Sequence, residues 1–66
     1  MTEEAASYIR AIRNPIKRAY AEKYAAWNET GGAAETEPLV PVGLSYMAAQ
    51  AVRMTLAALW PYKENR

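Results

Sequence analysis

The chain has 66 residues, no cysteine, no histidine and a formal net charge of +1. This length allows one small domain, and the missing side chains exclude disulfides and the usual zinc sites as sources of stability. The small net charge excludes a strong overall electrostatic field, and the hydrophobic share of 52% overstates the core because fourteen of these residues are alanines.

The N-terminal segment has the pattern of a helix start. Thr2 offers a capping hydroxyl, and Glu3 and Glu4 suit the positive end of the helix dipole. Apolar residues then recur at helical spacing as far as Ile12. This pattern predicts a first helix over 3–13.

The pair Asn14-Pro15 predicts the start of a second helix, because Asn is a strong N-cap and Pro favours the first helical position. The alternative is one long helix kinked at Pro15. A second apolar stripe runs to Trp27, and the glycine pair at 31–32 tolerates the left-handed backbone that ends many helices. We therefore expect a second helix, or a kinked continuation of the first, over 15–29.

Residues 30–43 are rich in Gly, Ala, Thr, Glu and Pro, which predicts an extended loop. Pro38 and Pro41 favour an extended backbone, because proline fixes its own φ and restricts the residue before it. We expect this loop to lie as a strap whose Leu39, Val40 and Val42 cover the core. A docking peptide for a proline-binding groove is the alternative.

Segment 44–60 has the clearest helical pattern, with Ser45 as its expected cap. Pro61 closes this helix and is the first residue of the tail over 61–66. One face repeats apolar residues at intervals of 3, 4, 3 and 4, and its seam is made of alanines and methionines rather than leucines. Small residues let two helices approach closely, and Met fills irregular gaps. We therefore expect this face to contact another helix, either the first helix of the same chain or the same helix of a second copy. The predicted interface residues are Leu44, Met47, Ala48, Ala51, Met54, Thr55, Ala58 and Trp60.

These elements predict an all-α fold, a helical hairpin whose first arm is kinked or broken at Asn14-Pro15 and whose arms are joined by the extended loop. A chain this short buries little apolar surface alone, and we expect Tyr46, Leu56 and Trp60 on the back of the last helix to stay exposed. Oligomerisation or a partner would then complete the core. The sequence therefore predicts a non-enzymatic protein-interaction or assembly protein, either a homo-oligomer or a small subunit of a larger complex.

No set of residues in the sequence has the pattern of a catalytic site. Ser7 and Ser45 have no histidine to activate them, since the chain contains none. The carboxylates of Glu3 and Glu4 are explained by the helix start. We therefore expect no enzymatic activity, no cofactor and no metal site.

A nucleic-acid-binding regulator or accessory protein is the alternative function. If the first two helical segments were coaxial, three of their basic residues would share one face, where they could contact phosphates. The aromatic residues nearby lie on the apolar stripe, which favours a place in the core over stacking on bases. The candidate nucleic-acid contacts are Arg10, Arg13, Lys17, Arg18 and Lys23.

The apolar stretch 39–60 is long enough to cross a bilayer, but Arg53 near its middle costs about 3 kcal/mol on an insertion scale. We therefore expect no membrane contact for the isolated chain, and a span within a membrane complex stays an alternative. The N-terminus lacks the apolar centre of a signal peptide, so we expect a cytoplasmic protein.

Overall fold

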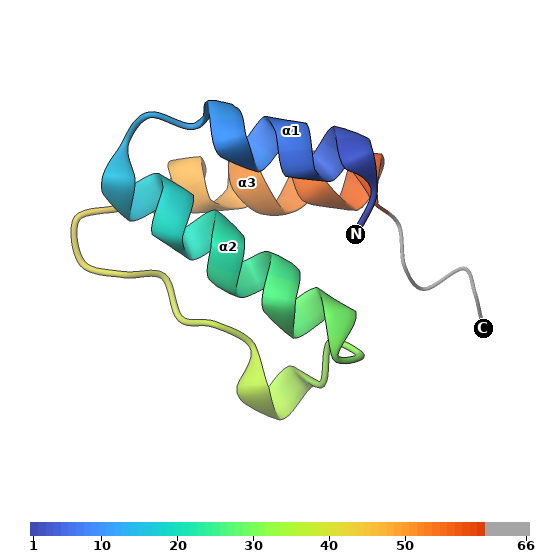
Figure 1. Cartoon of the computed structure of the whole chain (residues 1–66). Coiled ribbons are helices and arrows are strands. Elements are labelled where there is room, and N and C mark those ends of the chain that lie inside the picture. Colours follow the sequence, from blue (N-terminus) through green and yellow to red (C-terminus); the bar gives the residue numbers. More distant parts are fainter. Residues whose placement is uncertain (61–66) are drawn as a thin grey trace.

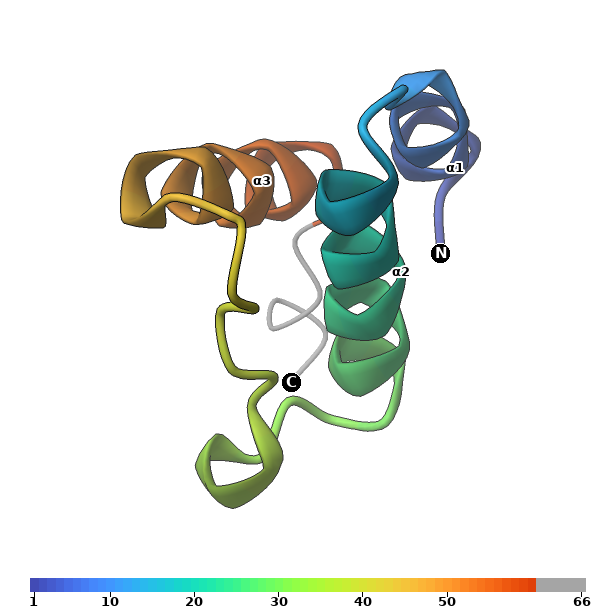
Figure 2. The ribbon, with the colours of Figure 1, turned by 90° about the vertical axis from the view of Figure 1, so that its left-hand side faces the viewer.

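The computed structural model describes residues 1–60, and within them it contains three α-helices, one short 3₁₀ turn and no strand. The helices are α1 (Glu3–Ala11), α2 (Pro15–Glu29) and α3 (Tyr46–Leu59), and the 3₁₀ turn η1 (Ala34–Thr36) lies between the last two. The all-α prediction is confirmed. Figure 1 shows α1 and α3 running in opposite directions, with α2 slanting away beneath them. In Figure 2, α2 lies between α1 and α3, and each helix contacts both of the others.

The chain between α1 and α2 breaks at Asn14. Its side-chain Oδ1 accepts hydrogen bonds from the backbone N–H groups of Ile16 and Lys17, at 2.9 and 3.0 Å. Pro15 is the first residue of α2, and α1 has already ended at Ala11. The two segments are therefore separate helices, and the alternative of one long kinked helix is wrong.

The end of α2 is fixed by the glycine pair and by Trp27. Gly31 and Gly32 have φ angles of 106° and 66°, in the left-handed region that suits glycine. The backbone N–H of Gly32 donates to the carbonyl oxygen of Trp27 at 3.1 Å. The indole Nε1 of Trp27 donates to the carbonyl oxygen of Ala33 at 2.8 Å, and this bond ties the beginning of the strap to α2.

The strap covers the core with one of the three apolar side chains expected there. Val40 packs against the buried residues, whereas Leu39 is 89% exposed and Val42 is 98% exposed. Val42 lies at the tip of a turn in which the N–H of Leu44 donates to the carbonyl oxygen of Pro41 at 3.2 Å. Gly43 follows with a φ of 95°, and a Cβ there would lie 2.9 Å from Cδ1 of Ile16. The turn therefore points Val42 into solvent, and the expectation for Leu39 and Val42 is wrong.

The third helix begins at Tyr46, after Ser45, whose hydroxyl oxygen accepts a hydrogen bond from the N–H of Ala48 at 3.0 Å. Its inner face is Ala49, Val52 and Leu56, all fully buried. The expectation that Leu56 stays exposed is therefore wrong, because this residue lies on the side of α3 that packs against the other helices. The buried apolar core is Ala5, Ile9, Ile12, Tyr20, Ala21, Ala25, Ala49, Val52 and Leu56.

A hydrogen bond also joins the two ends of the fold. The hydroxyl of Thr2 accepts the N–H of Ala5 at 3.1 Å and donates to the carbonyl oxygen of Leu59 at 2.9 Å. One side chain therefore caps the beginning of α1 and holds it to the end of α3. The predicted tail over 61–66, with Pro61, lies outside the described residues.

Within residues 1–60, no helix combines the length and the apolar character that crossing a membrane requires.

Candidate functional site

The side of α3 that faces away from the other helices is apolar and open to solvent. We call it the outer face of α3. Met47 is 80% exposed and Met54 is 64% exposed. One polar side chain, that of Gln50, interrupts this surface, and no charged residue lies on it. The outer face comprises Met47, Gln50, Ala51, Met54, Ala57 and Ala58, all exposed.

The helical repeat explains why α3 has apolar residues on two sides. Positions 49, 52 and 56 follow one side of the helix and fill the core, whereas positions 47, 51, 54 and 58 follow a different side. A helix that only covered its own core would carry polar residues on that second side. The apolar outer face is therefore not required by the fold of a single chain.

The predicted interface residues divide between this outer face and its edge. Leu44, Ala48 and Thr55 are half-buried, and Trp60 is half-buried against the core. The two alanines expected at the closest approach, Ala51 and Ala58, are exposed. The sequence predicted that either the first helix of the same chain or the third helix of a second copy contacts this face. The first of these predictions is wrong, because α1 does not cover these alanines.

Arg53 is the one charged residue of α3, and its side chain turns back toward α2. The guanidinium Nη1 donates to the phenolic oxygen of Tyr20 at 3.0 Å, and the guanidinium carbon lies 5.6 Å from the ring centre of Tyr46. Because the charged guanidinium donates this hydrogen bond to Tyr20, the bond favours the charged form and raises the pKa of Arg53 above its usual value. This arrangement holds the positive charge at the border of the outer face and leaves the face itself neutral.

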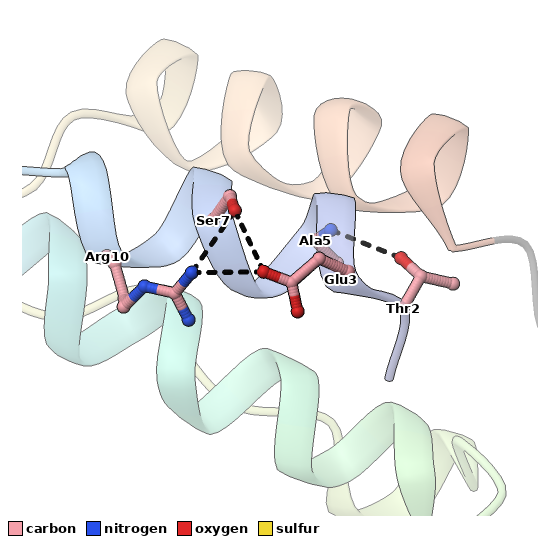
Figure 3. A network of polar contacts seen from close by, with 5 residues as sticks. All are labelled: Thr2, Glu3, Ala5, Ser7 and Arg10. Carbon is pink, nitrogen blue, oxygen red and sulfur yellow. Dashed lines mark hydrogen bonds and ion pairs between the residues drawn. The ribbon is translucent and has the colours of Figure 1, made fainter.

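Two of the five basic residues considered for nucleic-acid binding pair with carboxylates of their own helix. The Nη2 of Arg10 lies 3.2 Å from Oε2 of Glu3 and also donates to the hydroxyl of Ser7 at 3.2 Å, as Figure 3 shows. The Nε of Arg18 lies 3.5 Å from Oε2 of Glu22, one helical turn along α2. Such exposed pairs add little stability, but they reduce the charge offered to a phosphate.

The other three basic residues do not continue one surface with these two. Arg13 and Lys17 line a hollow of about 300 Å³ at the junction of α1 and α2. Lys23 lines a different groove, between α2 and the strap. The coaxial arrangement that would align Arg10, Arg13 and Lys17 is absent, because α1 and α2 pack against each other. Tyr20, one of the aromatic residues near these basic residues, is 2% exposed, in agreement with a place in the core.

Two apolar grooves were not predicted from the sequence. One, of about 390 Å³, lies between α1 and α2 and has Arg10, Glu22 and Glu29 among its lining residues. The other, of about 340 Å³, is formed by α2 and the strap and includes Ile16 and Leu39. The proline spacing of the strap predicted an extended segment. It did not predict where a groove would separate that segment from α2.

Within residues 1–60, no group of three or more carboxylates lies close enough to hold a metal ion. Glu3 and Glu4 lie in the first turn of α1, and Glu3 pairs with Arg10. In this part of the chain the most distinctive surface is therefore an apolar one, the outer face of α3. Comparison with family models, with characterised proteins and with solved structures finds no match.

Proposed function

We propose that this chain is a non-enzymatic helical protein that works by associating with other protein chains through the outer face of α3. The observation that supports the proposal is the exposure of Met47 and Met54 on a face without charge. Interface cores are enriched in Met and depleted of charged residues. Burying a Met side chain completely contributes roughly 1.5–3 kcal/mol, so covering both would provide a substantial driving force.

The size of the chain favours the same function. A domain of about 60 residues buries a smaller share of its surface than a larger one and is marginally stable alone. Here much of the core is alanine, with Ala5, Ala21, Ala25 and Ala49 among the buried residues. Association would add apolar burial that the single chain lacks. A homo-oligomer is the simplest form, and a small subunit of a larger complex is the other.

A pair of matched substitutions tests the proposal. Met54→Lys places a charge on the outer face, and Val42→Lys places the same charge on a residue of the strap that is 98% exposed. We expect size-exclusion chromatography with light scattering to show an oligomer for the unmodified chain and for Val42→Lys. Met54→Lys should shift the population to the monomer, because association would bury an unpaired charge. Equal masses for the two variants would contradict a contact at the outer face.

Nucleic-acid binding is the second candidate function. It is favoured by Arg13 and Lys17, which line one hollow and form no ion pair within the described residues. This function predicts binding that weakens steeply with added salt and is lost when Arg13 and Lys17 become Glu. Association through an apolar face predicts no such dependence. Fluorescence anisotropy with labelled DNA and RNA at two salt concentrations separates the two functions.

The cytoplasmic location expected from the sequence stays a prediction.

A further inference from the structure

We propose that the outer face of α3 pairs with the same face of a second copy in antiparallel orientation. In this pairing Met47 lies opposite the partner's Ala58, and Ala51 lies opposite the partner's Met54. The inference rests on the proposed function and adds to it the identity of the partner, its orientation and the register of the contact. It follows from the order of large and small side chains along α3 and from the charge at the two ends of the helix.

The order of side-chain sizes favours the antiparallel arrangement. Along the outer face, the sequence of positions is Met47, Ala51, Met54 and Ala58, at intervals of 4, 3 and 4. These intervals are those of the contact seam in a two-stranded helical pair. When a second α3 is reversed about the midpoint of these four positions, each of the four positions lies opposite one position of the partner. Each such pair, or layer of the contact, contains one Met and one Ala. Every layer then has the same summed volume, and the two helices can keep a constant separation.

A parallel pairing in register gives a less even contact. It would place Met47 beside the partner's Met47 and Ala51 beside the partner's Ala51. Met pairs would hold the two backbones apart, and the Ala pairs between them would leave space unfilled. Cavities and overpacking both destabilise a contact, so alternating sizes select the reversed orientation.

The charge on the helix ends favours the same orientation. α3 carries no acidic residue in its first turn and no basic residue in its last turn. Its partial positive charge at the beginning and partial negative charge at the end are therefore not balanced by its own side chains. An antiparallel partner brings each end next to the opposite charge, whereas a parallel partner brings like ends together.

The residues that flank the seam do not oppose this pairing. Ala48, Gln50, Thr55 and Ala57 lie beside the four central positions, and none is charged. Helical pairs commonly select their partner and orientation through charges at these flanking positions. Because α3 has none there, its side-chain sizes and end charges decide the orientation.

Disulfide cross-linking tests the register directly, because the chain contains no cysteine of its own. Three single variants are needed, namely Met47→Cys, Ala58→Cys and, as a control on the exposed strap, Val42→Cys. In the antiparallel pair, position 47 of one copy lies beside position 58 of the other. Position 47 is then about 16 Å along the helix axis from its own copy, which is too far for a disulfide.

We expect an equimolar mixture of Met47→Cys and Ala58→Cys to form a covalent dimer on mild oxidation. Neither variant alone, nor either mixed with Val42→Cys, should do so. A cross-linked dimer of Met47→Cys alone would overturn the antiparallel register and leave association through the outer face standing. An oligomer by light scattering without any of these cross-links would overturn the register too, because the contact would lie elsewhere. A monomeric mass with no cross-link would contradict self-association itself.

Discussion

The guanidinium of Arg53 donates a hydrogen bond of 3.0 Å to the phenolic oxygen of Tyr20, which lies 33 positions earlier in the chain. Tyr20 is 2% exposed, and a buried tyrosine hydroxyl without a partner is destabilising. The bond therefore joins α2 to α3 at the edge of the core. It also explains why an arginine is found in an otherwise uncharged helix without placing charge on the outer face.

Replacing Tyr20 with Phe should destabilise the fold. The variant keeps the ring but removes the acceptor of Arg53, and we expect the free energy of unfolding to fall by about 1 kcal/mol. The half-buried guanidinium can turn to water, which limits the loss. Urea unfolding at low protein concentration measures it. Tyr46→Phe is the control, because the Tyr46 ring is exposed, and equal effects of the two variants would contradict a role for the bond.

Two alanines of α3, on either side of Gln50, should respond differently to enlargement. Ala49 is fully buried, whereas Ala51 is exposed on the outer face. Ala49→Leu should overpack the core and cost about 1–3 kcal/mol at every protein concentration. Ala51→Leu should change the stability of the monomer by less than about 0.5 kcal/mol but weaken association, because the added side chain meets the partner's Met54.

Thermal unfolding at two protein concentrations separates these effects. The unfolding midpoint of Ala49→Leu should lie below that of the unmodified chain at both protein concentrations. The unfolding midpoint of Ala51→Leu should lie below that of the unmodified chain at the higher concentration alone. A large loss for Ala51→Leu in dilute solution would show that this residue is packed within the monomer.

Removing the cap of α2 should destabilise the helix start. Asn14→Ala loses the acceptor for the N–H groups of Ile16 and Lys17, and caps of this kind contribute about 1 kcal/mol. Asn14→Asp keeps an acceptor at the same place and should retain most of the stability. Chemical denaturation of both variants checks the difference, and the prediction fails where Asp and Ala lower the unfolding free energy equally.

Asn28 is a buried polar residue whose replacement should be tolerated. It is 5% exposed, and its side-chain Oδ1 accepts no hydrogen bond within residues 1–60. Such an unsatisfied group is costly, and an apolar side chain of similar shape can be neutral or stabilising. We expect Asn28→Leu to raise the unfolding free energy by about 1 kcal/mol. A clear loss of stability on thermal unfolding would show that the amide has an essential role.

The beginnings of the helices could be predicted from the sequence because they depend on local chemistry. Thr2, Asn14 and Ser45 each cap a helix through one side chain and the N–H groups that follow it. The left-handed glycines at 31–32 are equally local. None of these features depends on a distant part of the chain, so residue type and spacing were sufficient to identify them.

The buried side of α3 could not be predicted in the same way, because the helix is apolar on both sides. The sequence pattern favoured the Met and Ala stripe, whereas the structure buries the side containing Val52 and Leu56. The side that the structure buries borders Arg53, whose charge is accommodated by Tyr20. That partner is distant in sequence, so the pattern within α3 could not reveal it.

Sedimentation equilibrium of the unmodified chain across the micromolar range, at low and high salt, tests self-association most directly. We predict that the average mass rises with concentration from that of one chain toward that of two, with little dependence on salt, because the proposed contact is apolar. A mass that stays at one chain over the whole range would contradict the account.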